Sequence, residues 1–349
     1  MNTFPFPPPD APRAKPRIQP VFIPFQGCPM RCVFCAQTLQ TGETPRNVRL
    51  VLDDLAAALD RALASSEPPR ELAFYGGTFT ALPLSDQFAC LELAARYQAK
   101  GLITNVRAST RPDALSLSHL DALRKAGLAM LELGVQSFSD TPLTASRRGY
   151  SGATAVAGCR MVRDSGLALG IQLMPGMPGM QPEHFFHDLE TTLVQLPAAV
   201  RLYPCLVLAD TPLATLFERG EFAPWSLETV IPLLAKAQSA FWNADIPVIR
   251  IGLAPQDGLD RDGILAGPVH PALGSIVRSV ALFRYIHDVV ARLGSPVTAL
   301  AMPRRFQGEF WGHRGTLKND YAALGITPAN VIFQETGWCE FTCSDFPPQ

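Results

Sequence analysis

The chain has 349 residues, 47% of them hydrophobic and 17% charged, which is enough apolar sequence for a large buried core. Its formal net charge of −1 at pH 7 excludes attraction of a polyanion by the field of the whole molecule, so any nucleic-acid contact needs a local basic patch. No apolar stretch is long enough for a membrane-spanning helix, and no basic segment precedes an apolar run as in a secretory signal, so we expect no membrane partner.

The first 17 residues are rich in proline, most densely from Phe4 to Pro9. Proline fixes the backbone angle φ and has no N–H to donate, which favours an extended, polyproline-like conformation. We therefore predict a tail over residues 1–17, either free or wrapped onto the main domain.

From Arg17 onward, short apolar runs alternate with helical patterns. The runs are continuously apolar, which is typical of parallel strands covered on both faces. The predicted strands are Ile18–Phe25, Leu72–Gly76, Ile103–Ser109, Met130–Gln136, Ala168–Met174 and Val200–Leu208. The predicted helices are Leu52–Ala64, Leu84–Ala99, Asp113–Ala126, Thr154–Asp164, Pro182–Gln195 and Leu227–Trp242. This alternation predicts an α/β fold with a parallel sheet, either open and doubly wound or curled into a full or partial barrel.

A cysteine cluster follows the first predicted strand, where Cys28, Cys32 and Cys35 are spaced Cys-x₃-Cys-x₂-Cys. Three thiols on one loop cannot all pair as disulfides, whereas clustered thiolates suit an iron–sulfur centre. On a four-iron cluster, three cysteines would leave one iron open to a substrate. A partial zinc site or three unrelated thiols are the alternatives. Eight cysteines without an export signal favour a reducing compartment, the cytoplasm.

Residues suited to ligand binding follow the other predicted strands, at the sheet edge where parallel α/β folds place their sites. Gly76 and Gly77 would let a backbone edge approach a ligand closely, and Thr78 adds a hydroxyl. The amide of Gln136 suits a ribose or a carboxylate, and Arg148 suits a carboxylate. For the glycines, the alternative is an ordinary turn. For Gln136 it is a buried amide that satisfies backbone groups, and for Arg148 it is a solvated charge.

Taken together, these motifs resemble the radical S-adenosylmethionine (SAM) superfamily, in particular the branch of the Elongator catalytic subunit and oxygen-independent coproporphyrinogen oxidase. The resemblance covers residues 18–253 and lies in the cysteine motif, Tyr75–Thr80, Leu131–Phe138, Arg148–Tyr150, Leu173–Gly179 and Arg201–Leu213. It implies a partial (β/α)₆ barrel with a 4Fe–4S cluster on Cys28, Cys32 and Cys35. It also implies SAM as a second cofactor and a flavodoxin- or ferredoxin-like electron donor as a partner.

The resemblance assigns SAM contacts to individual residues. Gly76, Gly77 and Thr78 would line the methionine part, while Gln136, Arg148 and Gln172 would contact the rest and Phe34 would lie against the adenine. Ser109 stands where relatives carry a glutamate, and Gln172 stands where the coproporphyrinogen oxidase pattern has an aspartate. No residue is singled out as catalytic. We expect the barrel interior to be walled by Leu, Ile and Met, since few polar groups should meet a radical.

The other cysteines give weaker signals. Cys90 and Cys159 are expected in helix cores, and Cys205 either in the core or facing the pocket as a hydrogen donor. Cys339 and Cys343 lack a further ligand nearby, so a second cluster there is not expected.

After Leu253 the composition changes. Residues 255–295 are predicted as a linker or lid, Pro255–Pro271, followed by the helix Leu273–Leu293. Residues 296–349 are predicted as a small α+β domain with strands at Val297–Met302 and Val331–Gln334. Its order of strand, helix, Gly-x-x-Gly turn, helix and strand resembles a minimal KH module, whose turn grips the nucleic-acid backbone.

A local basic patch surrounds that turn. Between Pro303 and Asn319 lie Arg304, Arg305, Arg314 and Lys318, against the single acid Glu309. The candidate RNA contacts are Gly312, His313, Arg314, Gly315 and Lys318. The alternative is a purely structural turn in a domain that caps the barrel.

Three functions stay open on this evidence. The first is a radical SAM enzyme acting on RNA, such as a tRNA base. The second is a radical SAM enzyme acting on a small molecule such as a tetrapyrrole. The third is a non-catalytic protein that carries a cluster or haem.

Overall fold

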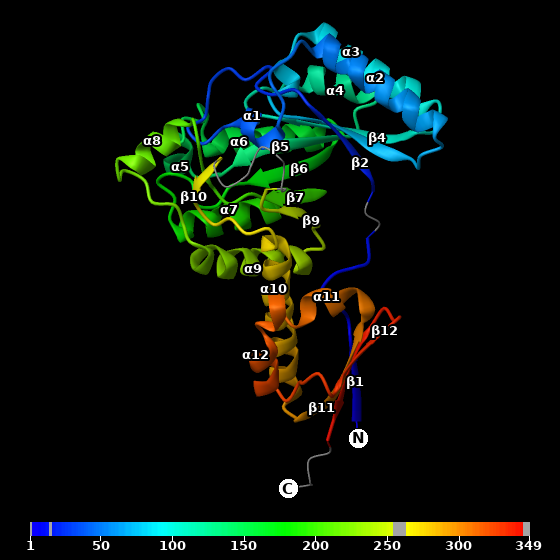
Figure 1. Ribbon diagram of the computed structural model, residues 1–349, viewed down its shortest axis with the longest axis vertical. Coiled ribbons are helices and arrows are strands. Elements are labelled where there is room, and N and C mark those ends of the chain that lie inside the picture. Colours follow the sequence, from blue (N-terminus) through cyan, green and yellow to red (C-terminus); the bar gives the residue numbers. More distant parts are fainter. Residues whose placement is uncertain (1, 14–15, 254–262, 345–349) are drawn as a thin grey trace. The chain divides into compact units, whose positions relative to one another are not determined.

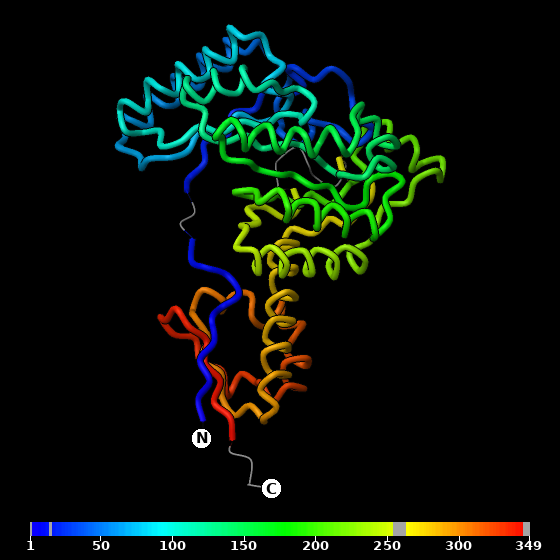
Figure 2. Tube along the Cα trace, turned by 180° about the vertical axis from the view of Figure 1, so that it is seen from behind, coloured from blue at the N-terminus to red at the C-terminus, as the bar shows by residue number. Residues whose placement is uncertain are grey.

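The structure is a computed structural model that describes residues 2–13, 16–253 and 263–344. The chain forms two compact units, which are best followed separately (Figures 1 and 2). The larger comprises residues 14–226 and 248–269, and the smaller comprises residues 1–13, 227–247 and 270–349. Within the described residues, no helix has both the length and the apolar character that a membrane crossing requires.

The larger unit is built on a curled parallel sheet of seven strands, in the order β2-β3-β4-β5-β6-β7-β9 (Figure 1). The strands are β2 (Ile18–Phe22), β3 (Arg70–Tyr75), β4 (Ile103–Thr110), β5 (Met130–Gln136), β6 (Ala168–Leu173), β7 (Ala199–Leu202) and β9 (Val248–Ile251). Because each crossover adds the next strand at the same growing edge, the sheet curls in one direction into a half-barrel. The predicted α/β class and partial barrel are therefore confirmed.

The sheet has one strand more than predicted. All six expected strands are present, and β9 pairs in parallel with β7, with Arg201 opposite Arg250. It was missed because it is only four residues long, follows Pro247 and contains an arginine, so it gives no continuous apolar run.

Alternation along the strands separates two faces of the sheet. In β5, Leu131, Leu133 and Val135 are completely buried, each adding about 1.5–3 kcal/mol of apolar burial. Glu132, Gly134 and Gln136, on the same strand, line a cavity instead. The main crossover helices are α2 (Val48–Ala64), α3 (Leu84–Gln98), α4 (Leu117–Lys125), α6 (Gly152–Asp164) and α7 (Pro182–Gln195).

Shorter elements complete the larger unit. They are α1 (Gln37–Thr41), η1 (Phe79–Ala81), α5 (Asp140–Ala145) and α8 (Pro212–Glu218). Strands β8 (Val207–Leu208) and β10 (Ile264–Ala266) pair antiparallel. Part of the predicted lid at 255–271 is thus strand β10, while residues 254–262 lie outside the described part of the chain.

The smaller unit has a four-stranded sheet in the order β1-β13-β11-β12. These strands are β1 (Asn2–Phe6), β13 (Cys339–Cys343), β11 (Val297–Pro303) and β12 (Val331–Gln334). Its helices are α9 (Leu227–Asn243), α10 (Leu273–Leu293), α11 (Gln307–Phe310) and α12 (Lys318–Ala323), with 3₁₀ turns η2 (Arg304–Phe306) and η3 (His313–Gly315). The element order predicted after residue 296 is found, with β11 and β12 parallel.

Two expectations about this unit differ from the structure. Residues 2–6 were predicted as part of a tail, yet they form β1 and pair antiparallel with β13, Phe6 lying opposite Cys339. Pro5 is compatible with this because β1 is an edge strand, where a missing N–H costs no ladder bond. Helix α9 was predicted within the barrel domain, but it packs on α10 and belongs to the smaller unit.

Candidate active site

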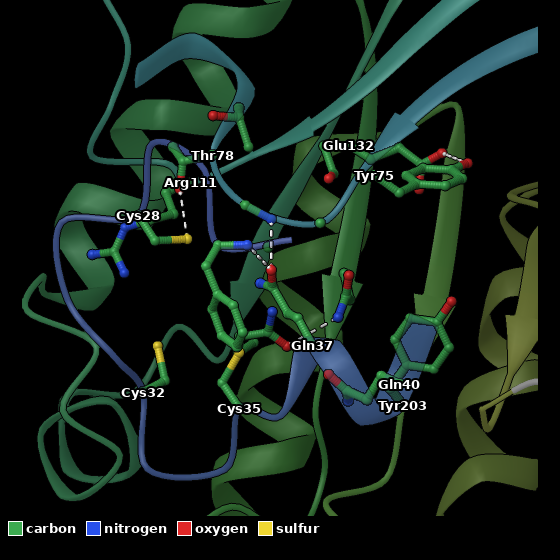
Figure 3. Close-up of a pocket in the computed structure, with 18 of the residues that line it drawn as sticks. Cys28, Cys32, Cys35, Gln37, Gln40, Tyr75, Thr78, Arg111, Glu132 and Tyr203 are labelled. Carbon is green, nitrogen blue, oxygen red and sulfur yellow. Dashed lines mark hydrogen bonds between the residues drawn. The ribbon is translucent and has the colours of Figure 1, made fainter. Parts of the chain in front are cut away.

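A cavity of about 430 Å³ opens on the concave face of the half-barrel. It is lined by the loop that carries the three clustered cysteines, by the turn after β3 and by residues of all seven parallel strands or the segments that follow them. Figure 3 shows the cavity with Cys28, Cys32 and Cys35 to the left and Tyr75, Glu132 and Tyr203 to the right. Residues far apart in the sequence therefore share one site.

The cysteine loop is fixed by neighbours on both sides. The Val33 N–H donates to the Ser146 carbonyl at 3.3 Å, and the Leu213 N–H donates to the Val33 carbonyl at 2.9 Å. All three thiols line the cavity, and their sulfurs turn toward a common space in Figure 3. The Cys28 sulfur also lies 3.4 Å from the Thr78 hydroxyl. A loop held in this way presents its sulfurs in a preset arrangement.

The donor set suits a cluster better than a single ion. Among the described residues, no three His, Cys, Asp or Glu side chains are grouped to hold one metal ion, which removes support for a zinc site. An iron–sulfur cluster takes each thiolate on a different iron, so its sulfurs need not converge on one point. Burial, with the charges of Cys32 and Cys28, raises the pKa of Cys35 to about 12. A thiolate at Cys35 therefore needs a positively charged group beside it.

Arg148 is buried next to the cysteine loop, with 6% of its surface exposed. Its Nη1 donates to the Cys32 sulfur at 3.0 Å, and its Nη2 donates to the Gly134 carbonyl at 2.5 Å. Its Nε donates to the Tyr150 hydroxyl at 3.0 Å. The sequence predicted a contact between Arg148 and the SAM carboxylate. In this structure the guanidinium contacts a cluster cysteine and the strand end.

The other predicted SAM contacts line the same cavity. These are Phe34, Gly76, Gly77, Thr78, Ser109, Gln136 and Gln172. Gly77 has φ of +70°, and a Cβ there would lie 2.2 Å from the Gln26 carbonyl oxygen, so only glycine fits beside the cysteine loop. Gln136 holds a left-handed φ of 67°, at a cost of about 1–3 kcal/mol for a non-glycine residue. Gln172 Nε2 lies 3.5 Å from Gln136 Oε1.

Gln37 is a site residue that the sequence did not point out. Its side-chain oxygen accepts a hydrogen bond from the Gly77 N–H at 3.0 Å and another from the Phe25 N–H. Through one amide it joins the segment after the cysteines to the glycine turn. Its position two residues after Cys35 is the only sequence signal that could have indicated it.

A buried ionic network at the other end of the cavity was also missed. Glu132 is 5% exposed, and it accepts from Arg201 Nε at 2.5 Å and from the Tyr75 hydroxyl at 2.8 Å. Burial alone would raise the pKa of Glu132, but Arg201, Tyr75 and Arg107 outweigh it and lower the pKa. Glu132 is therefore a carboxylate. The expectation of Leu, Ile and Met walls holds only in part, because Met30, Met174 and Leu253 line the cavity together with charged and polar strand residues.

The proposed RNA contacts lie in the smaller unit and not in the cavity. The turn at Gly312–Gly315 is tight, with φ of 74° at Gly312 and 55° at Arg314. Arg314 and Lys318 are exposed. The patch is less basic than the sequence suggested, because Arg304 pairs with Glu335 at 2.8 Å and Arg305 with Asp10 at 3.5 Å.

The remaining cysteines are buried and free. They are Cys90, Cys159, Cys205, Cys339 and Cys343, and none lines the cavity. Cys205 is thus a core residue in this structure, and Cys339 and Cys343 pack in the core of the smaller unit.

Comparison with known proteins identifies the family. Residues 22–191 match the radical SAM superfamily, and residues 197–281 match the radical SAM C-terminal domain. The chain belongs to the radical SAM superfamily. A 4Fe–4S cluster and SAM are typical cofactors of this family of enzymes.

Curated relatives of this radical SAM chain include tRNA-modifying proteins. It is 30% identical over 251 residues to the tRNA uridine(34) acetyltransferase of Methanocaldococcus infernus, which covers 61% of this chain and 47% of that protein. It is 27% identical over 199 residues to Elongator complex protein 3 of Homo sapiens, covering 50% of this chain and 36% of that protein. The chain thus spans about half or less of the length of these relatives.

A solved structure shares the radical SAM fold. The archaeal Methanocaldococcus infernus Elp3 with an N-terminal deletion superposes with a TM-score of 0.57 at 23% sequence identity. The match covers 79% of this chain and 64% of that chain.

Proposed function

We propose that this protein binds a 4Fe–4S cluster through Cys28, Cys32 and Cys35 and cleaves SAM reductively in the cavity of the larger unit. The observation that supports this most directly is that the three thiols and every predicted SAM contact line one cavity. When bound, the cluster supplies the electron that breaks a C–S bond of SAM, giving methionine and a 5′-deoxyadenosyl radical that takes a hydrogen atom from the substrate.

In this proposal, the residues of the chain bind SAM and orient it and the cluster ligands. Gly76 and Gly77 line the cavity where the methionine part of SAM would lie against the backbone, and Thr78 adds a hydroxyl at the same turn. The amides of Gln136 and Gln172 present donors and acceptors for the ribose and adenine. Arg148 donates to Cys32, which orients that ligand and favours its ionised form.

An electron must reach the cluster from outside the chain, so a flavodoxin- or ferredoxin-like donor completes the proposal. All eight cysteines are free, which suits a reducing compartment such as the cytoplasm.

As the substrate class we propose RNA, specifically tRNA. The name of the archaeal relative, tRNA uridine(34) acetyltransferase, supports this, as does the exposed pair Arg314 and Lys318 beside a Gly-x-x-Gly turn of the kind that contacts nucleic-acid backbone.

The test of the chemistry is anaerobic reconstitution with iron and sulfide, followed by SAM and a strong reductant. Wild-type protein is expected to bind iron, absorb visible light and release 5′-deoxyadenosine, measured by mass spectrometry. Cys32→Ala should lose both iron and product. Cys90→Ala, which removes a buried thiol that does not line the cavity, should retain both. Wild-type product no greater than that of Cys32→Ala would overturn the enzymatic proposal and leave a carrier.

The test of the substrate class is tRNA binding at several salt concentrations. Lys and Arg contacts to phosphates give an affinity that falls steeply with salt. Arg314→Glu should weaken binding about tenfold and reduce the salt slope, whereas Arg160→Glu, on the exposed face of α6, should change neither. Binding with no salt slope and no response to Arg314→Glu would contradict RNA and favour a small molecule.

A further inference from the structure

The charges that line the cavity are strongly unequal. The lining contains five arginines but only one carboxylate, that of Glu132. The arginines are Arg31, Arg111, Arg148, Arg201 and Arg250. Unpaired charge in a partly enclosed cavity costs free energy, because the charge loses hydration that only a partner of the opposite sign offsets. The cavity as a whole therefore favours an anion.

Most of these arginines already have partners. Arg111 pairs with Asp113 at 2.8 Å, and Arg148 donates to the Cys32 sulfur at 3.0 Å. The exposed Arg31 lies over the ring of Phe25, 3.3 Å from its centroid. These contacts belong to the cysteine end of the cavity.

The opposite end of the cavity, around Glu132, has hydrogen-bond donors that are not fully used. Both oxygens of Glu132 are taken, one by Arg201 Nε at 2.5 Å and the other by the Tyr75 hydroxyl at 2.8 Å and by Arg201 Nη2 at 3.2 Å. This pairing fixes the plane of the Arg201 guanidinium. Its Nη1 donates only to the Tyr203 hydroxyl, at 3.2 Å. The hydroxyl proton of Tyr203 has no acceptor among the described residues.

At this end of the cavity, Arg250 has no counter-charge among the described residues. Register places it beside Arg201 on the neighbouring strand β9, and its Nε donates to the Gly252 carbonyl at 3.1 Å. No carboxylate of the described residues forms an ion pair with it. Arg201, Tyr203 and Arg250 all line the cavity, so the two terminal nitrogens of Arg250, the Arg201 edge and the Tyr203 hydroxyl can serve as donors to an oxyanion there.

The proposed cofactors do not supply that anion. SAM carries a sulfonium, an ammonium and one carboxylate, so it brings net positive charge, and its methionine part is proposed to lie at the glycine turn beside the cysteine loop. A cluster would lie at the cysteine end. An anionic substrate would supply the missing charge.

We propose that Arg201, Arg250 and Tyr203 form an oxyanion subsite that holds a phosphate of the nucleotide substrate while its sugar and base extend toward the cysteine end. This inference rests on the proposed function, because it takes the substrate to be a nucleic acid. A phosphate offers several acceptor oxygens to two guanidiniums and a hydroxyl, which a single carboxylate matches less well.

The experiment compares ligands that differ only in the phosphate. Binding of uridine 5′-monophosphate, uridine 3′-monophosphate and uridine to reconstituted protein with SAM is measured by calorimetry at low salt. One charge-assisted contact predicts that at least one monophosphate binds about tenfold tighter than uridine. Arg250→Gln should bring this ratio close to one, and Arg250→Lys should keep part of it. Arg160→Gln, an exposed residue outside the cavity, should leave it unchanged.

Tyr203→Phe keeps the volume of the ring and should lower the ratio a few-fold, which guards against a folding defect of the arginine variants. Equal binding of uridine and both monophosphates to wild type, or a ratio insensitive to Arg250→Gln and Tyr203→Phe, would overturn the subsite. Competition by propionate as strong as by inorganic phosphate would overturn the phosphate assignment in favour of a carboxylate substrate.

Wild-type release of 5′-deoxyadenosine is measured on the same preparation. Tighter binding of a monophosphate without release of 5′-deoxyadenosine would contradict the proposed function but not the subsite. Product without phosphate preference would contradict the subsite alone.

Discussion

The two ends of the cavity are built in different ways. At the cysteine end, Cys28, Cys32, Cys35 and Gln37 come from ten consecutive residues, and one glycine turn packs against them. At the charged end, Tyr75, Glu132, Arg201 and Arg250 come from four separate strands and meet only through sheet register. A short segment can therefore encode the cysteine motif that is typical of the family, whereas the charged surface opposite is assembled from the whole barrel.

The largest effect is expected from breaking the ionic network at the charged end. Glu132→Gln leaves Arg201 and Arg107, both largely buried, without their shared carboxylate. Removing one member of a buried ion pair costs about 3–5 kcal/mol, because a charge stays buried without a partner. Chemical unfolding should report this loss of stability.

The double variant Glu132→Gln with Arg201→Gln is the control for that prediction. It should recover part of the stability, since only the lone charge is costly. A double variant as unstable as the sum of two single variants would contradict the coupling.

At the cysteine end, Gly77→Ala should be nearly as damaging. The new Cβ would meet the Gln26 carbonyl at 2.2 Å in a left-handed backbone, so we expect a loss of about 3 kcal/mol and a several-fold drop in iron bound per chain. Gly101→Ala is the matched control, with φ of +74° and nothing within 4 Å of the added carbon. It should cost about 1–2 kcal/mol and leave iron binding intact. Equal effects would mean that backbone conformation alone is responsible.

Asp188 of helix α7 contacts the residues that follow β5, outside the cavity lining, and predicts a pH dependence. It accepts from the Phe138 N–H at 2.7 Å and the Ser137 hydroxyl at 3.0 Å, and burial raises its pKa to about 6. Because the folded state holds the proton more tightly than the unfolded one, this group lowers stability as pH rises from about 4 to 6.

Asp188→Asn keeps the accepting oxygen and removes the charge. It should remove roughly 2 kcal/mol of this pH-dependent loss. Unfolding measured at pH 4.5, 6 and 7.5 tests the slope, and a slope shared by both proteins would contradict the prediction.

The smallest effect is expected at Gln37. Gln37→Leu removes the acceptor for the Gly77 and Phe25 N–H groups, at a cost of about 1–2 kcal/mol, and should speed loss of iron to a chelator. Gln37→Glu keeps an oxygen at the same place and should restore most of the stability. Gln40→Leu, one turn along α1, changes a side chain with no hydrogen bond among the described residues and should have little effect. Similar losses for both leucine variants would contradict the linking role of Gln37.

This contrast also explains what could be predicted from the sequence. Cys28, Cys32 and Cys35 stand out by spacing alone, and six strands stand out as apolar runs. Strand β9 and the charged end could not be found in that way, because the pairing of Arg201 with Arg250 depends on register between strands that are separated by helices α8 and α9. The expected apolar walls are found only in part. In Met130–Gln136 the signal was present, since Glu132, Gly134 and Gln136 alternate with buried Leu131, Leu133 and Val135.

The pairing of β1 with β13 constrains the order in which the chain is completed on the ribosome. The seven strands of the parallel sheet are all translated once Ile251 has emerged, whereas β1 has to wait for residues 339–343 before it can pair. Closing so long a loop is slow compared with local contacts. The half-barrel can therefore acquire its structure during synthesis, and the smaller sheet reaches its final pairing only after the last strand is released.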